Sequence, residues 1–195
     1  MKRKGSTEPR LVWMRIDKIP PNPANPKEHD LDAIDASMDA FGFRSPCVFN
    51  DGSGLNSEGH GRVEVLLRRH ADGRPAPRGV RGPNGKGAAK KGGVWTIPVI
   101  VGMPPFESPE HEEQWLAASN RLVERGGWNP EKLAALLRTV PEPQLLGFLP
   151  DEVGDLLKSI ESDDPANAVQ PEVDESAASG VKYATCPKCE HRFAL

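Results

Sequence analysis

The segment that decides the fold lies at residues 57–62 and reads Ser57-Glu58-Gly59-His60-Gly61-Arg62. Before it, residues 46–50 have the apolar content of a short strand that the turn at 51–52 closes. After it, apolar residues recur from 63 to 70 at the spacing of one helix face. Because two glycines allow the backbone to turn tightly, we predict a strand, a glycine loop and a helix in this order.

This loop also has the composition of an anion site. Backbone N–H groups that follow glycine can point into one cavity, and a helix start adds unpaired donors and a partial positive charge. The Arg62 guanidinium matches the oxygens of a phosphate group, and His60 can donate or transfer a proton. We therefore predict phosphate binding by Gly59, His60, Gly61 and Arg62. The alternative is a plain strand-to-helix turn in which Arg62 pairs with a nearby acid.

The other elements predict an α+β fold with a small mixed sheet packed against helices. Residues 11–16 and 97–101 are expected strands, and Pro98 places the second at its start or at a sheet edge. Asp30 is an expected cap for a helix that Gly42 ends, and three more helices begin at 108, 129 and 150. The domain then covers 10–160, with 129–160 as a helical extension.

A second polar point, Asn120-Arg121, lies within the expected helix that follows residue 108. Its neighbours at helical spacing predict a buried face, formed by Trp115, Leu116, Ser119, Leu122 and Val123. We expect Asn120 and Arg121 to lie beside the phosphate loop. The alternative is a pair on the helix surface without a ligand.

Charge and composition divide the chain into a core and several less apolar segments. Glycine (19) and proline (20) account for about a fifth of the 195 residues, which predicts long loops or tails. The net charge of -3 excludes wholesale coating of nucleic acid, although residues 1–9 are basic and 161–182 form an acidic linker with the composition of disorder. Residues 72–93 predict a flexible basic insertion, either a contact for DNA phosphates or an inert loop.

The three cysteines indicate a reducing compartment. An odd number argues against a secreted disulfide scaffold, and no apolar run is long enough to span a membrane, so we expect a cytoplasmic protein. Cys186 and Cys189 form a CxxC motif that predicts, with His191, a zinc-knuckle-like tail over 183–195. Three ligands are an incomplete set, so the fourth would come from Cys47, another histidine, water or a second copy in a homodimer. A free CxxC or half of a zinc ribbon is the alternative.

Five segments, taken together, resemble the ParB/sulfiredoxin superfamily: 22–29, 34–46, 59–64, 97–101 and 117–122. Their order is similar to that of phage-type ParB N-terminal-like proteins, also described as ParB-like nucleases. The resemblance implies a nucleotide, with Mg²⁺, at the loop. Chromosome-segregating members have Gly-Glu-Arg-Arg-x-Arg there, and 59–64 retains only the first glycine and one arginine.

The resemblance leaves two classes of function open, and a purely structural adaptor that works through the acidic tail and the CxxC motif is a third. The first is a phage or prophage accessory protein that binds DNA backbone or nucleotide phosphate without sequence specificity, beside a DNA methyltransferase or another DNA-modifying enzyme. The second is an enzyme, either a nuclease or a nucleotide-dependent phosphotransferase or NTPase. His60, Glu58 and Glu64 are its candidate catalytic residues, and a nuclease would also need carboxylates for Mg²⁺, for which Asp51 is a further candidate.

Overall fold

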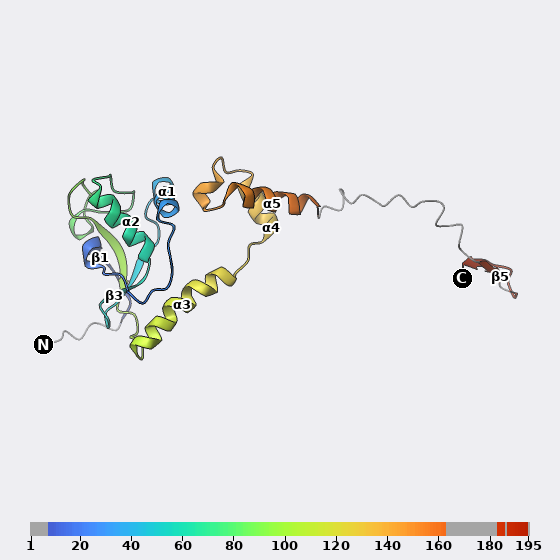
Figure 1. Ribbon diagram of the computed structural model, residues 1–195, viewed down its shortest axis with the longest axis horizontal. Coiled ribbons are helices and arrows are strands. Elements are labelled where there is room, and N and C mark those ends of the chain that lie inside the picture. The colour runs from blue at the N-terminus through green and yellow to red at the C-terminus, as the bar shows by residue number, and fades with distance from the viewer. Residues whose placement is uncertain (1–7, 163–182, 186, 195) are drawn as a thin grey trace. The chain divides into compact units, whose positions relative to one another are not determined.

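The computed structural model describes residues 8–162, 183–185 and 187–194. The chain divides into two compact units, Met1–Val153 and Gly154–Leu195. The first unit holds a four-stranded sheet and most of the helices, coloured from blue to orange in Figure 1. The second holds a two-stranded hairpin, β5 (Tyr183–Thr185) with β6 (Arg192–Ala194).

The sheet confirms the predicted α+β class. Its order is β1 (Arg10–Arg15), β4 (Thr96–Val101), β2 (Cys47–Asn50) and β3 (Leu55–Glu58). The outer pairs β1–β4 and β2–β3 are antiparallel, whereas β2 and β4 are parallel, so the sheet is mixed. Side chains alternate between the two faces of β4, so that Ile97, Val99 and Val101 are buried on one face.

Strand β4 corrects the expectation drawn from Pro98. It lies inside the sheet, between β1 and β2, and Pro98 is its third residue. The pairing of β4 with β2 covers only Val99 and Ile100, so Pro98 lies outside that ladder. A missing N–H is therefore tolerated within an interior strand.

Two helices cover the inner face of the sheet. Helix α1 (Leu31–Phe41) is capped by Asp30, whose carboxylate accepts from the Ala33 N–H at 2.9 Å, and it ends at Gly42 as predicted. Helix α2 (His60–Ala71) packs against α1. Arg69, 1% exposed, lies between them and pairs with Asp35 and, at 2.6 Å, with Asp39. A buried guanidinium is stable here because several carboxylate oxygens accept from it.

The start of α2 differs from the predicted loop. Residues 55–58 form strand β3, and only Gly59 separates this strand from the helix. His60, Gly61 and Arg62 therefore belong to the first helical turn. The strand is preceded by the Asn50–Gly54 turn, in which the Gly54 N–H donates to the Asn50 carbonyl at 2.8 Å.

The basic segment 72–93 buries more apolar surface than its composition predicts. Val80 is 4% exposed within the core, and Ala76 and Ala89 pack against it. Arg81 and Thr96 exchange backbone hydrogen bonds of 2.9 and 2.8 Å, and a short 3-10 turn, η2 (Pro83–Gly85), contacts β1 and β4. Tertiary contacts therefore bury apolar side chains in a segment whose own composition is poor in them.

The remaining helices begin where their caps predict. Helix α3 (Pro109–Arg125) has Ser108 as its cap, and α4 (Pro130–Leu137) has Asn129. A 3-10 turn, η3 (Pro143–Leu146), precedes α5 (Pro150–Ser162). No helix among the described residues is long and apolar enough to cross a membrane.

The predicted inner face of α3 is only partly correct. Leu116 is 1% exposed, but Leu122 and Val123 are 63% and 80% exposed, and Trp115 is also exposed. The first half of α3 is held to the sheet by the buried Glu112 carboxylate, which accepts from the hydroxyls of Ser53 (3.1 Å) and Ser57 (3.4 Å). The apolar spacing continues beyond that contact, so it does not mark burial along the whole helix.

Candidate functional site

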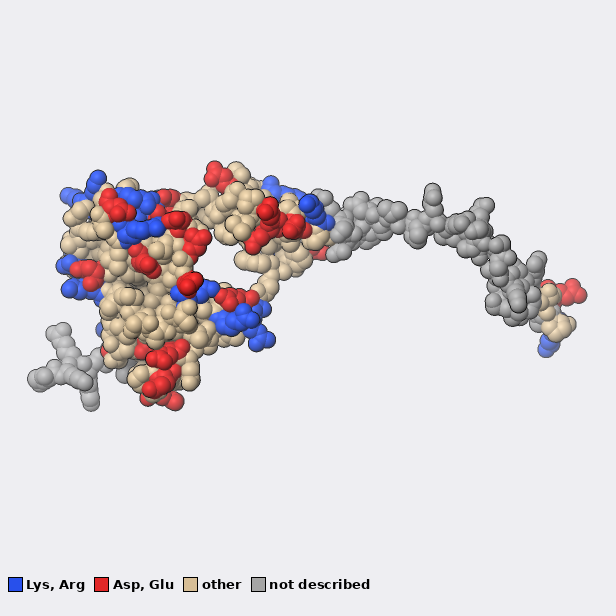
Figure 2. Space-filling view, viewed as in Figure 1, with Lys and Arg blue, Asp and Glu red and all other residues tan. Residues whose placement is uncertain are grey.

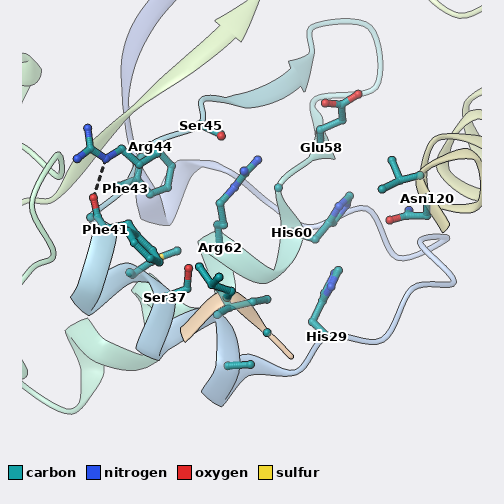
Figure 3. Close-up of a pocket in the computed structure, with 18 of the residues that line it drawn as sticks. His29, Ser37, Phe41, Phe43, Arg44, Ser45, Glu58, His60, Arg62 and Asn120 are labelled. Carbon is teal, nitrogen blue, oxygen red and sulfur yellow. Dashed lines mark hydrogen bonds between the residues drawn. The ribbon is translucent and has the colours of Figure 1, made fainter. Parts of the chain in front are cut away.

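A cavity of about 950 Å³ lies at the start of α2. Its walls are α1, residues 42–45, the end of β3 with the start of α2, one turn of α3 and the end of η3 (Figure 3). The polar lining residues that carry the argument are His29, Arg44, Glu58, His60, Arg62 and Asn120. The cavity therefore gathers residues from distant parts of the sequence around the predicted phosphate loop.

Gly59 shapes the entrance to α2. Its φ of 92° lies in the left-handed region, where a residue with a side chain is strained. A Cβ built at Gly59 would lie 2.7 Å from the Cys47 Sγ and 2.8 Å from a terminal nitrogen of Arg62. The glycine therefore allows the tight turn that the sequence predicts, and it also allows the close approach of the Arg62 side chain.

Gly61 serves a packing role. A Cβ there would lie 2.8 Å from Ile34 Cδ1 and 2.9 Å from the His29 ring. Gly61 is buried and is not among the residues that line the cavity. Its contribution to the site is indirect, because it lets the first turn of α2 approach α1 and the loop that carries His29.

Arg62 lines the cavity with part of its hydrogen-bonding capacity unused. One terminal nitrogen donates to the Pro46 carbonyl at 3.3 Å. The Nε is buried and, within the part of the chain that the structure describes, has no hydrogen-bond partner. Among the residues that the structure describes, Arg62 has no ion pair with a carboxylate, which was the alternative to an anion site.

His60 and His29 lie side by side in the cavity with their rings stacked, at a centroid distance of 6.5 Å (Figure 3). The His60 Nε2 accepts from the Asn22 N–H at 3.3 Å, which leaves Nδ1 as the protonated nitrogen of the neutral ring. Burial, reinforced by the neighbouring His29, lowers the pKa of His60 below its ordinary value. His60 is therefore a neutral hydrogen-bond donor near pH 7.

His29 is a residue of the cavity that is not among the predicted site residues. Its Nε2 is buried without a partner among the described residues, like the Nε of Arg62. A single histidine in a proline-rich stretch carries no spacing signal. Only the contact between this stretch and α2 brings it to the site.

The two predicted site residues of α3 have different surroundings. Asn120 lines the cavity, and its amide donates to the Leu116 carbonyl at 2.7 Å. Arg121 is 70% exposed in its side chain, pairs with Glu124 at 3.2 Å and does not line the cavity. The expectation that both residues lie beside the loop thus holds in the structure for Asn120 alone.

The three candidate catalytic residues are only partly brought together. Glu58 and His60 line the same cavity, whereas Glu64 is exposed and does not line it. Asp51 accepts from the Gly102 N–H at 2.6 Å, away from this site. Among the described residues no group of three or more His, Cys, Asp or Glu side chains could hold a metal ion.

The predicted zinc ligands belong to the second unit. Cys189 and His191 are exposed in the connection between β5 and β6, and Cys186 lies outside the described residues. Zinc at this tail therefore stays a prediction. The acidic linker lies outside the described residues from 163 onward, and residues 161–162 belong to α5.

The remaining lining gives the cavity a mixed character. One part is apolar and includes Ile34, Met38, Phe41, Phe43, Leu145 and Leu146. The charged residues are two arginines, Arg44 and Arg62, against Glu58 alone. A cavity with a net positive charge and an apolar wall suits an anion that carries an apolar or aromatic group.

No protein-family model matches the chain, and no curated protein matches it. Among solved structures, the chain is similar to the C-terminally truncated chromosome-partitioning protein ParB from Caulobacter crescentus, in complex with CTP-gamma-S. The sequence identity is 16% and the TM-score is 0.46. The match covers 80% of this chain and 81% of that chain.

Proposed function

We propose that this chain binds the phosphate groups of a nucleotide in the cavity at the start of α2, as an accessory protein of the phage-type ParB-like class. The observation that carries the proposal is the Arg62 guanidinium, which lines the cavity, donates to a backbone carbonyl and has no ion pair with a carboxylate among the described residues. A guanidinium that no carboxylate neutralises favours an anionic oxygen beside it.

Two further features support an anion at this place. The start of α2 carries a partial positive charge, and N–H groups of its first turn have no acceptor within the helix. The buried Nε2 of His29 lacks a partner among the described residues. A polyphosphate would receive hydrogen bonds from these groups, with Mg²⁺ held by the phosphate oxygens.

The apolar wall favours a nucleotide over the backbone of a DNA duplex as the occupant of the cavity. Phe41, Phe43 and Leu146 offer contacts that a base or sugar can fill. DNA backbone would instead bind outside, at exposed lysines of the 72–93 segment such as Lys86, Lys90 and Lys91. Arg74 of the same segment pairs with Asp35 and Asp39 and contributes less.

Two finer parts of the proposal come from the sequence. The resemblance to phage-type proteins implies action beside a DNA methyltransferase or another DNA-modifying enzyme. The CxxC tail implies zinc, for which metal analysis of the Cys189→Ser protein is the test. Zinc bound at the tail would be lost in that variant.

Thermal unfolding of the full chain with a panel of ligands tests the nucleotide site. The panel contains pyrophosphate, cytidine and the four ribonucleoside triphosphates, each with and without Mg²⁺. A bound ligand at about 100 times its Kd raises Tm by roughly 5–10 °C for a chain of this size. We expect a triphosphate to raise Tm more than pyrophosphate, because only the triphosphate also fills the apolar part.

Arg62→Ala and Arg121→Ala form a matched pair for this assay. Each removes one guanidinium, but only Arg62 lines the cavity. The ligand-induced shift should disappear in Arg62→Ala and persist in Arg121→Ala. A panel without any shift, or a shift of the same size in both variants, would contradict the proposal.

A catalytic role is the second candidate, and it rests on Glu58 and a neutral His60 in one cavity. These residues are the acid–base pair that hydrolysis or transfer of a phosphoryl group would need. Labelled ATP, labelled CTP and plasmid DNA are incubated with Mg²⁺ and either the wild type or His60→Ala. Turnover that is absent, or equal in both proteins, would exclude this role for His60.

A further inference from the structure

The face of the sheet opposite α1 and α2 carries an apolar surface. Leu11 pairs with Ile100 and Trp13 with Pro98, so these four side chains share one face. Val12, Met14 and Val99 alternate with them and pack in the core on the other face. Leu11 is 54% exposed and Trp13 is 37% exposed, so the outer face is open to solvent at β1.

This surface continues across β2 toward the start of α3. Val48 pairs with Ile100 and thus lies on the same outer face. Val48 also lines a smaller cavity, of about 200 Å³, together with Met103, Pro104, Phe106 and Trp115. Met103 and Trp115 are 44% and 40% exposed. We define the outer-sheet patch as the following residues: Leu11, Trp13, Val48, Pro98, Ile100, Met103, Phe106 and Trp115.

The two ends of the outer-sheet patch have opposite charge. At one end, the Arg81 guanidinium lies 6.0 Å from the centre of the Trp13 ring, and Gly85 packs against the same ring. Lys86 follows Gly85 and is exposed. At the other end, Glu107 precedes α3, and Glu110 and Glu113 lie near the start of this helix, where Figure 2 shows acidic side chains gathered.

We propose that the outer-sheet patch is the interface between two copies of this chain. In a two-fold pair the same patch serves both copies, so the basic end of one lies against the acidic end of the other. An apolar patch with opposite charges at its two ends is complementary to itself. A nucleic acid suits it less, because the three glutamates would repel phosphates. This interface is separate from the nucleotide cavity, and either proposal can fail without the other.

The test measures self-association of the full chain by sedimentation velocity over a range of concentrations. EDTA is present, so that zinc at the CxxC tail cannot join the copies. Leu11→Lys places a charge within the patch, on the outer strand β1, at an exposed position that the folded monomer tolerates. We expect it to weaken the dimer by at least about tenfold in Kd. Leu136→Lys, at another exposed leucine (51%), should leave Kd unchanged.

A charge exchange identifies the pairing itself. Lys86→Glu and Glu113→Lys should each weaken self-association, because each places like charges together at both ends of the pair. An equimolar mixture of the two variants should associate as the wild type does, since both ends again carry opposite charges. A chain that stays monomeric at about 100 μM, or a dimer that none of these substitutions weakens, would overturn the proposal. So would a loss of oligonucleotide binding in Leu11→Lys with self-association unchanged.

Discussion

At the scale of single residues, Gly59 links the backbone to the site. Its positive φ strains any other residue by about 1 kcal/mol or more, and a Cβ there would crowd Cys47 and Arg62. Gly54 has a similar φ of 74°, but a Cβ there would meet nothing within 4 Å. The two positions therefore share the backbone cost and differ in crowding.

We expect Gly59→Ala to lower the free energy of unfolding by about 1–3 kcal/mol more than Gly54→Ala does. The difference measures the crowding against Cys47 and Arg62, because the backbone strain is common to both variants. Urea denaturation monitored by tryptophan fluorescence gives both values. Equal losses in the two variants would show that Gly59 is needed only for its backbone conformation.

His60 makes stability depend on pH. Burial lowers its pKa in the folded protein, so between that value and the ordinary 6.5 the unfolded chain binds more protons. The free energy of unfolding should therefore fall as the pH drops below about 6.5. His60→Gln should reduce this slope when urea unfolding is measured between pH 5 and 8. Identical slopes in the two proteins would contradict the lowered pKa.

The residues of the site were predictable to different degrees. Gly59 and Arg62 follow a local rule, because a glycine turn before an arginine at a helix start is visible in sequence. Asn120 and Arg121 are adjacent, and neighbouring positions on a helix point about 100° apart, so only one can face the cavity. His29 was missed because its role depends on a tertiary contact that no local pattern records.

At the scale of elements, the helix caps carry the clearest signal. Asp30→Ala removes the side chain that accepts from the Ala33 N–H, so we expect a loss of about 1 kcal/mol in unfolding free energy. Asp30→Asn keeps an accepting oxygen and should retain most of that stability. Thermal unfolding of the three proteins is the measurement. Because α1 forms one wall of the cavity, the Ala variant should also bind nucleotide less tightly.

The strands were less predictable than the helices. Residues 55–58 read Leu-Asn-Ser-Glu, which lacks the alternation of a half-buried strand, and the β2–β3 pairing alone makes them one. Pro98 predicts a strand start or a sheet edge, but it lies within an interior strand. Its effect depends on how far the neighbouring strand extends. Sheet partners are distant in sequence, so local propensity decides them poorly.

At the scale of the whole molecule, salt dependence distinguishes the binding of DNA at surface charges from the binding of a nucleotide in the cavity. Binding of DNA through exposed lysines releases counterions, so its affinity should fall steeply with added salt. The triple variant Lys86→Gln, Lys90→Gln and Lys91→Gln should lower the slope of log K against log salt by about 3, roughly one per lysine. Fluorescence anisotropy with two unrelated duplexes measures both the slope and the absence of sequence preference.

Lys132→Gln, in α4, is the control for a change of charge elsewhere on the protein. It should leave the slope close to that of the wild type. No detectable binding to either duplex at low salt would remove DNA from the list of partners. Nucleotide binding should be unaffected in the triple variant, because none of the three lysines lines the cavity.

The sheet also contains a built-in reporter of its own opening. Cys47 is fully buried between β4 and the start of α2, and burial raises the pKa of its thiol to about 11. Only a thiolate reacts readily with iodoacetamide, so Cys47 should resist alkylation while exposed Cys189 reacts at once. The rate of Cys47 carboxamidomethylation, monitored by mass spectrometry, then reports how often this part of the chain unfolds. A nucleotide that occupies the adjoining cavity should lower this rate of alkylation.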